Sequence, residues 1–120
     1  MDSFALIIFG ITGNLAQIKL IPALYDMEEK GLLPSGMDIV GIARKEMTDV
    51  KLQNYVHEVL HLKNIHHQHE IKKEIFKKLC TRLKYISGEI QDQNLYGQLK
   101  KYLKHDNRIY YLATYPDLYH

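Results

Sequence analysis

Residues 4–16 read F-A-L-I-I-F-G-I-T-G-N-L-A, and the fold class of the chain is indicated by this segment. The run Phe4–Phe9 is continuously apolar and partly β-branched, which is typical of a strand buried on both faces of a parallel sheet. Gly10 ends this run, and Asn14 has a side chain suited to capping a helix. A buried strand, a glycine turn and a helix start in this order predict an α/β protein.

Beyond this stretch, strand-like apolar runs alternate with helical spacing in the order β-α-β-αα-β-α-β. Strands joined through helices form a parallel sheet, and right-handed crossovers give the spatial strand order 3-2-1-4. This arrangement is about the first half of a dinucleotide-binding fold of the Rossmann type. We therefore expect residues 1–120 to form one incomplete domain of this kind.

The element boundaries follow from caps, breaks and the limits of each apolar pattern. Pro22 is predicted to kink the first helix or to split off its first turn, because proline lacks a backbone donor. The later strands are expected at Asp38–Ala43, Lys84–Gly88 and Arg108–Thr114. The helices are expected at Leu15–Lys30, after a cap at Thr48, after a break near Asn64, and at Asp92–Lys104.

The chain has 120 residues, of which 46% are hydrophobic and 25% charged, which suits one globular domain. The net charge of +2 is too small to indicate a nucleic-acid partner. No apolar run approaches the roughly 20 residues of a membrane-spanning helix, and the first residues lack the basic start of a signal peptide. The single cysteine, Cys80, excludes an intramolecular disulfide and favours a cytoplasmic protein.

The turn from Gly10 to Ala16 has the composition of a phosphate-binding loop. Gly10 lets the chain leave the strand, Gly13 has no Cβ in the path of a pyrophosphate, and Ala16 lets helix and strand pack closely. Backbone N–H groups at the helix start face an anion there, with the positive end of the helix dipole behind them. The spacing G-x-x-G-x-x-A departs from G-x-G-x-x-G, so a glycine turn without a ligand is the alternative.

The end of the second strand indicates which dinucleotide is bound. A site for NAD places an acid there to hold the ribose 2′-hydroxyl, whereas a site for NADP places an arginine on the 2′-phosphate. Here Arg44 and Lys45 follow the strand, and the first acid is Glu46. The guanidinium is a planar, bidentate partner for a phosphate, which favours NADP. A solvated basic loop is the alternative.

Seven histidines raise the alternative of a metal site. His57 and His61 have the i, i+4 ligand spacing on an expected helix, and residues 66–69 read H-H-Q-H. No third ligand stands at a recognisable distance from them, so we interpret these histidines as solvated and expect no metal. The basic segment Lys63–Lys84 is interpreted as a solvated helix face, with an anionic partner as the alternative.

Five strings of the chain, taken in order, resemble glucose-6-phosphate dehydrogenase. They are I-I-F-G-I-T-G-N-L-A-Q-I-K-L-I-P-A-L-Y-D-M, K-G-L-L-P, I-V-G-I-A-R, Y-I-S-G-E-I and R-I-Y-Y-L-A-T-Y-P. The match runs from Phe4 to about Pro116, is weakest over Lys51–Leu79, and covers the N-terminal, coenzyme-binding part of that family. The resemblance implies an oxidoreductase of the pentose phosphate pathway, which uses NADP to oxidise glucose 6-phosphate to the lactone.

The resemblance also implies roles for individual residues. Arg44 would grip the 2′-phosphate of NADP, and Lys19 would face the coenzyme and the sugar phosphate of the substrate. Glu89 and Ile90 would line the adenine–ribose side. Without the resemblance, Lys19 is an ordinary lysine on a helix surface. The residues implied for the phosphate turn are Gly10, Ile11, Thr12, Gly13, Asn14, Leu15 and Ala16.

The chain departs from the family pattern in three ways. Asn14 stands where the family has Asp in G-D-L-A, and Gln17 and Ile18 stand where basic residues are usual. The family's catalytic lysine string E-K-P-F-G and histidine-base string R-I-D-H-Y-L-G-K do not occur in these 120 residues, and we expect no substrate domain among them. We expect these residues to bind the dinucleotide without catalysis, and glucose 6-phosphate to bind only in a full-length context. The alternative is a non-catalytic nucleotide-binding or regulatory module, or a truncated, decayed relative.

Overall fold

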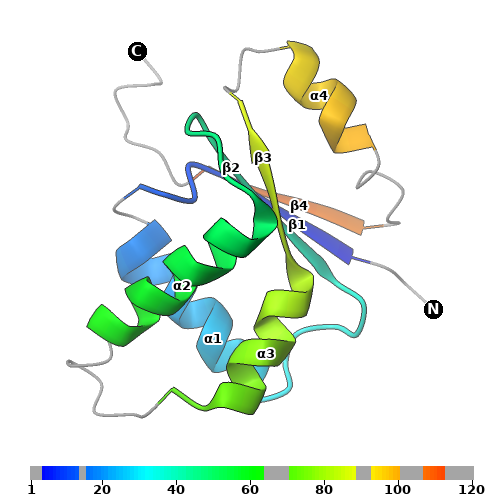
Figure 1. Ribbon diagram of the computed structural model, residues 1–120. Coiled ribbons are helices and arrows are strands. Elements are labelled where there is room, and N and C mark those ends of the chain that lie inside the picture. The colour runs from blue at the N-terminus through cyan, green and yellow to red at the C-terminus, as the bar shows by residue number, and fades with distance from the viewer. Residues whose placement is uncertain (1–3, 14–15, 64–70, 89–92, 101–106, 113–120) are drawn as a thin grey trace.

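The structure, a computed structural model, describes residues 4–13, 16–63, 71–88, 93–100 and 107–112. These residues form one four-stranded parallel sheet with helices on both of its faces (Figure 1). The strands are β1 (Phe4–Phe9), β2 (Asp38–Ala43), β3 (Leu83–Ser87) and β4 (Asn107–Leu112). The helical segments are η1 (Ala16–Leu20), α1 (Ile21–Glu29), α2 (Asp49–Lys63), α3 (Lys73–Arg82) and α4 (Gln93–Leu99).

The strands lie in the order β3-β2-β1-β4, and every neighbouring pair is parallel. This order confirms the expected 3-2-1-4 arrangement, which right-handed crossovers impose. β1 is an inner strand that pairs with β2 on one side and with β4 on the other. The chain therefore adds β2 and β3 on one side of β1 and then β4 on the other side. Open α/β sheets bind ligands at the point where the strand order changes side in this way.

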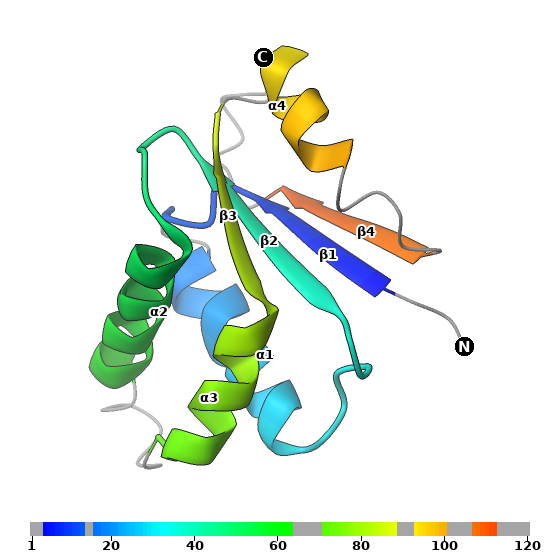
Figure 2. The ribbon, with the colours of Figure 1, turned by 45° about the vertical axis from the view of Figure 1, so that its right-hand side comes forward.

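The side chains of β1 and β2 alternate between two apolar cores, one on each face of the sheet. Leu6, Ile8 and Ile39 join the larger core, beneath α1, α2 and α3. Ile7 and Val40 point to the other face, where α4 adds Leu95 and Leu99. Figure 2 shows α1, α2 and α3 on one side of the sheet and α4 on the other. Each fully buried aliphatic side chain contributes about 1.5–3 kcal/mol through the hydrophobic effect.

Pro22 divides the first helical stretch as predicted. η1 is a short π-helical segment, and α1 begins at Ile21 with proline in its first turn. Proline is tolerated there because the first helical N–H groups have no partner within the helix. The sequence predicted the division but not the π-helical form of the segment before it.

The start of α2 is capped by Thr48, also as predicted. The Lys51 backbone N–H donates to Thr48 Oγ1 at 3.1 Å, which satisfies one of the unpaired donors of the first turn. Asp49 in that turn accepts a hydrogen bond from the backbone N–H of Tyr85 at 2.8 Å. This bond ties the beginning of α2 to the middle of β3, a link that the local sequence pattern did not indicate.

The later boundaries differ from the predicted ones by a few residues. β3 begins at Leu83 instead of Lys84, because Leu83 adopts an extended conformation directly at the end of α3. β4 begins at Asn107, one position before the predicted Arg108. The break near Asn64 and the end of the predicted helix Asp92–Lys104 lie outside the described residues. Within the described part of the chain, no helix is long and apolar enough to span a membrane.

Candidate functional site

The glycine turn lies at the carboxyl end of β1, in the middle of the sheet (Figure 1). Because all strands are parallel, the residues that follow β2 and β3 emerge at the same edge. The backbone N–H of Gly88, just after β3, donates to Ala43 O at the end of β2 at 2.9 Å. The fold therefore brings the turn, the end of β2 and the end of β3 together at one edge.

Three hydrogen bonds donated by its own N–H groups hold the backbone of the turn, and Gln17 donates two more, to Gly13 O and Thr12 O. The Gly13 N–H donates to Gly10 O at 2.9 Å, which closes a tight turn over these residues. The N–H groups of Gly10 and Ile11 both donate to Ile42 O of β2, at 2.8 and 3.2 Å. Gly10 has a φ of 85°, a conformation that side-chain-bearing residues rarely adopt. Gly10 is thus required by the turn geometry itself.

The residues predicted to bind the phosphates divide into an inner and an outer group. The Ile11 side chain is buried and its N–H is bonded to Ile42 O, so Ile11 holds the turn from inside the protein. Ala16 is fully buried at the start of η1, as its packing role requires. Thr12 and Gly13 are half-buried at the surface of the turn. Asn14 and Leu15 lie outside the described residues.

The end of β2 carries the residues predicted to select the dinucleotide. Arg44 follows Ala43 directly, and its side chain is exposed at the edge where the turn lies. The next residue, Lys45, accepts a hydrogen bond through its carbonyl oxygen from the Tyr85 hydroxyl. Burial raises the pKa of Tyr85, so this hydroxyl keeps the proton that it donates. Tyr85 therefore supports the segment that carries Arg44, a role that sequence reasoning missed.

A cavity of about 360 Å³ lies beside this segment. Glu46, Met47, Thr48 and Lys51 line it from the β2–α2 connection, and Ser87 lines it from the end of β3. It is therefore at the carboxyl edge of the sheet, on the side of β1 that leads toward β2 and β3. Its hydroxyl, ammonium and carboxylate groups suit the polar ribose end of a nucleotide better than an apolar ligand.

Lys19 is exposed on η1, next to the turn in sequence. Its exposure fits either an ordinary surface lysine or a group that meets an anion at the edge of the site. Glu89 and Ile90, predicted on the adenine–ribose side, lie outside the described residues, immediately after Gly88.

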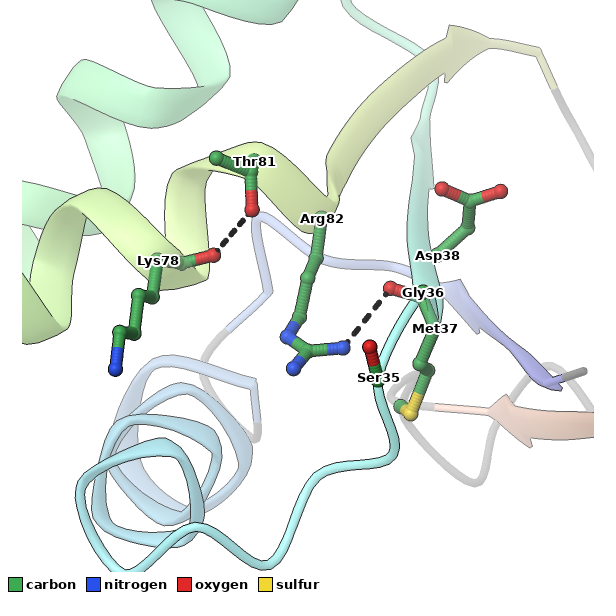
Figure 3. A pocket seen from close by; sticks show the side chains of 7 residues that line it. All are labelled: Ser35, Gly36, Met37, Asp38, Lys78, Thr81 and Arg82. Atoms are coloured by element: carbon green, nitrogen blue, oxygen red, sulfur yellow. Dashed lines mark hydrogen bonds between the residues drawn. The ribbon is translucent and has the colours of Figure 1, made fainter.

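A second cavity, of about 250 Å³, lies at the amino ends of the strands, far along the sheet from the turn. Figure 3 shows the Arg82 side chain reaching from the end of α3 toward the loop that precedes β2. Its Nη1 donates to Pro34 O at 2.6 Å and to Met37 O at 3.2 Å. Thr81 Oγ1 donates to Lys78 O at 2.6 Å. Arg82 thus holds the loop and Thr81 is bonded within α3, so we assign this cavity a structural role.

His57 of α2 makes ring contacts with His61 and with Phe76. The rings of His57 and His61 stack with centroids 6.3 Å apart, and Phe76 meets His57 edge-on at 5.0 Å. Among the described residues, no three histidine, cysteine, aspartate or glutamate side chains cluster closely enough to hold a metal ion. His66, His67 and His69 lie outside the described residues.

A parallel sheet with a glycine turn at its switch point defines the class of this protein, a nucleotide-binding domain of the Rossmann type. A family model described as "Glucose-6-phosphate dehydrogenase, NAD binding domain" matches residues 7–120. The chain belongs to this family of nicotinamide-dinucleotide-binding domains.

Two curated relatives illustrate the match. The chain is 32% identical to glucose-6-phosphate 1-dehydrogenase of Aspergillus niger, over 98% of this chain and 24% of that protein. It is 31% identical to the enzyme of the same name from Borreliella burgdorferi, over 99% of this chain and 23% of that protein. The chain thus spans about a quarter of the length of these relatives.

Solved structures of the same enzyme share the fold. The crystal structure of glucose-6-phosphate 1-dehydrogenase from Mycobacterium avium matches with a TM-score of 0.85 and 31% identity. That match covers 98% of this chain and 25% of the solved chain. A glucose-6-phosphate dehydrogenase in complex with its substrate glucose-6-phosphate matches with a TM-score of 0.79 at 23% identity, which is a likeness of fold alone.

Proposed function

We propose that this chain binds NADP as the coenzyme-binding segment of a glucose-6-phosphate dehydrogenase-like oxidoreductase. The observation that supports this proposal best is that Arg44 and the glycine turn share one edge of the sheet, on neighbouring strands. A pyrophosphate on the turn directs the adenosine toward β2, where the Arg44 guanidinium offers a bidentate partner for a 2′-phosphate.

The described residues fit a dinucleotide in this position. Gly10 and Gly13 leave two positions of the turn without side chains, and the bonds to Ile42 O fix the backbone of the turn against β2. The cavity next to Arg44 has room and polar groups for the ribose end, including Thr48 and Lys51. Asn14, Leu15, Glu89 and Ile90 complete the proposed set of contacts.

The chemistry of the whole enzyme follows from what the coenzyme and the protein each supply. The chemistry that bound NADP would supply is a hydride acceptor for the oxidation of glucose 6-phosphate at carbon 1 to the lactone. The residues of this chain bind and orient the coenzyme, and exposed Lys19 on η1 is proposed to face the sugar phosphate. The base that takes the hydroxyl proton belongs to motifs that these 120 residues do not contain.

A titration of the 120-residue chain with NADP and with NAD, followed by isothermal calorimetry, tests the proposal. We expect saturable binding of NADP and weaker binding of NAD, because only NADP carries the phosphate that Arg44 recognises. Equal affinities would refute the choice of NADP, and no binding of either would refute the coenzyme site. Activity of a longer polypeptide that continues into the two catalytic motifs separates the enzyme from a non-catalytic nucleotide-binding module.

A reducing compartment such as the cytoplasm is part of the proposal. The single cysteine, Cys80, supports it, since a one-cysteine chain gains no disulfide from an oxidising environment. Partial burial raises the pKa of the Cys80 thiol, which favours its protonated form.

A further inference from the structure

Ile11 is the residue through which the glycine turn is embedded in the protein. Only 1% of its surface is exposed, and it belongs to the core between the sheet and α1, α2 and α3. Its side chain lies directly over Gly41, in the middle of β2. Its backbone N–H is bonded to Ile42 O, the next residue of the same strand. The turn is therefore fixed to β2 both by its backbone and by one side chain.

The Ile11 side chain has space over β2 because Gly41 carries no side chain. A Cβ on Gly41 would lie 2.5 Å from Ile11 Cδ1, 3.0 Å from Cγ2 and 3.2 Å from Cβ. Rotation of the side chain moves Cδ1 and Cγ2, but Ile11 Cβ is bonded to the backbone of the turn. Relief of the contact with Ile11 Cβ therefore requires the turn and β2 to move apart by a few tenths of an ångström.

We propose that Gly41 is a positioning residue for dinucleotide binding, an inference that rests on the proposed function. By seating Ile11, Gly41 fixes the turn at a set distance from β2, and Arg44 extends from the same strand three positions later. The distance between the pyrophosphate-binding turn and the residue that binds the 2′-phosphate, Arg44, is thereby fixed. Sites that bind rigid ligand groups at two points lose affinity when their supporting residues let one point shift.

The competing explanation is that Gly41 only serves packing. In that case Gly41→Ala lowers the stability of the chain, while the folded fraction binds NADP as tightly as the wild type. The two explanations differ in ligand affinity and in the local behaviour of the turn, and both can be measured.

The experiment compares Gly41→Ala with two matched controls in the 120-residue chain. Gly97→Ala makes the same substitution in α4, where an added Cβ meets nothing within 4 Å. Leu99→Ala removes a buried side chain from the opposite core, and so lowers stability without touching the turn. Calorimetric titration with NADP gives the affinity, and amide hydrogen exchange of Gly10 and Ile11 in the ligand-free chain reports the bonds to Ile42 O.

For Gly41→Ala we expect NADP affinity to fall about tenfold or more. The exchange of the Gly10 and Ile11 amides should accelerate by a similar factor, because their bonds to Ile42 O lengthen or break. Neither control should change the NADP affinity. In both controls, the exchange of these two amides should change only as far as the overall stability of the chain changes.

A second variant keeps the test decisive if Gly41→Ala does not fold. The double variant Ile11→Ala/Gly41→Ala removes Cγ1, Cγ2 and Cδ1 of Ile11, and with them the two shortest contacts, while the contact of 3.2 Å between the two Cβ atoms stays. It should fold and recover part of the exchange protection of Gly10 and of the NADP affinity lost in Gly41→Ala, because only the longest of the three contacts remains.

Two results would overturn the inference. One is a folded Gly41→Ala chain with wild-type NADP affinity and wild-type exchange of Gly10 and Ile11; the other is a double variant that folds but has unprotected turn amides. Failure of the proposed function has a different signature, because then the wild-type chain itself binds neither NADP nor NAD. In that case the role of Gly41 in dinucleotide binding is refuted together with the proposed function. The amide exchange rates still show whether Gly41 fixes the turn.

Discussion

Arg82 and Glu28 form a two-point ion pair that joins α3 to α1. Arg82 Nε donates to Glu28 Oε1 at 2.8 Å, and Nη2 donates to Oε2 at 3.3 Å. The side chains are only 12% and 5% exposed. The third guanidinium nitrogen is bonded to the carbonyl oxygens of Pro34 and Met37. One side chain thus fixes α1, the loop before β2 and the α3–β3 junction relative to one another.

We predict that Arg82→Ala lowers the free energy of unfolding by about 3–5 kcal/mol, because it leaves the buried Glu28 carboxylate unpaired. Urea denaturation followed by circular dichroism measures the change. Lys72→Ala is the matched control, since Lys72 pairs with Glu29 at 3.1 Å on the surface and exposed pairs contribute little. Equal midpoints for the two variants would contradict the assignment of Arg82 as the anchor.

Arg44→Ala should weaken NADP binding by about 1.5–3 kcal/mol and leave NAD binding nearly unchanged. The reason is that the guanidinium is proposed to contact only the 2′-phosphate, which NAD lacks. Calorimetric titration of both dinucleotides measures the effect. Lys77→Ala, which removes the same charge from the exposed surface of α3, controls for the loss of positive field. A parallel loss of NAD affinity in Arg44→Ala would show that Arg44 acts elsewhere in the site.

Gly13→Val should abolish dinucleotide binding in a chain that still folds. A branched Cβ occupies the space that a pyrophosphate needs next to the turn, where Gly13 is bonded to Gly10 O. Circular dichroism and the unfolding midpoint establish whether the variant is folded, and an NADP titration then gives the result. A folded Gly13→Val chain with normal NADP affinity would mean that the turn is not the phosphate site.

The 120-residue chain should show no glucose-6-phosphate dehydrogenase activity, whatever its affinity for NADP. None of its histidines or lysines stands in a string like the family's catalytic motifs. Loss of a positioned base alone costs about 10²–10⁴-fold in rate, and loss of substrate positioning adds to this. The near-ultraviolet absorbance of NADPH measures turnover with excess glucose 6-phosphate. Activity that persists through a second chromatographic step would refute the prediction.

The strands were predictable because their signal is local. Phe4–Phe9 and Asp38–Ala43 are continuous buried runs, and the structure reproduces both ranges. The strand order followed from the handedness of crossovers, which does not depend on the side chains. The shift of β3 to Leu83 escaped prediction because α3 ends without a glycine or proline. Nothing in the sequence there separates the last helical residue from the first extended one.

The site was predictable only where its residues adjoin a strand. Gly10 and Arg44 each follow a buried run, so their place at one edge follows from the parallel sheet. The contact of Ile11 with Gly41 and the bond from Tyr85 to Lys45 join different strands. A glycine within I-V-G-I-A gives no sign of what lies over it, because that depends on how two distant segments meet in three dimensions.

The pairing of β1 with β4 has a consequence for the order in which the molecule is made. Phe4 lies opposite Asn107, so the first and last described strands are neighbours. While a ribosome is still adding residues before Asn107, β1 is an outer strand with one row of backbone groups unpaired. In such a nascent chain the glycine turn sits on the rim of the sheet. Synthesis of β4 gives β1 its second neighbour, so the strand reversal at β1 arises only when β4 has emerged from the exit tunnel.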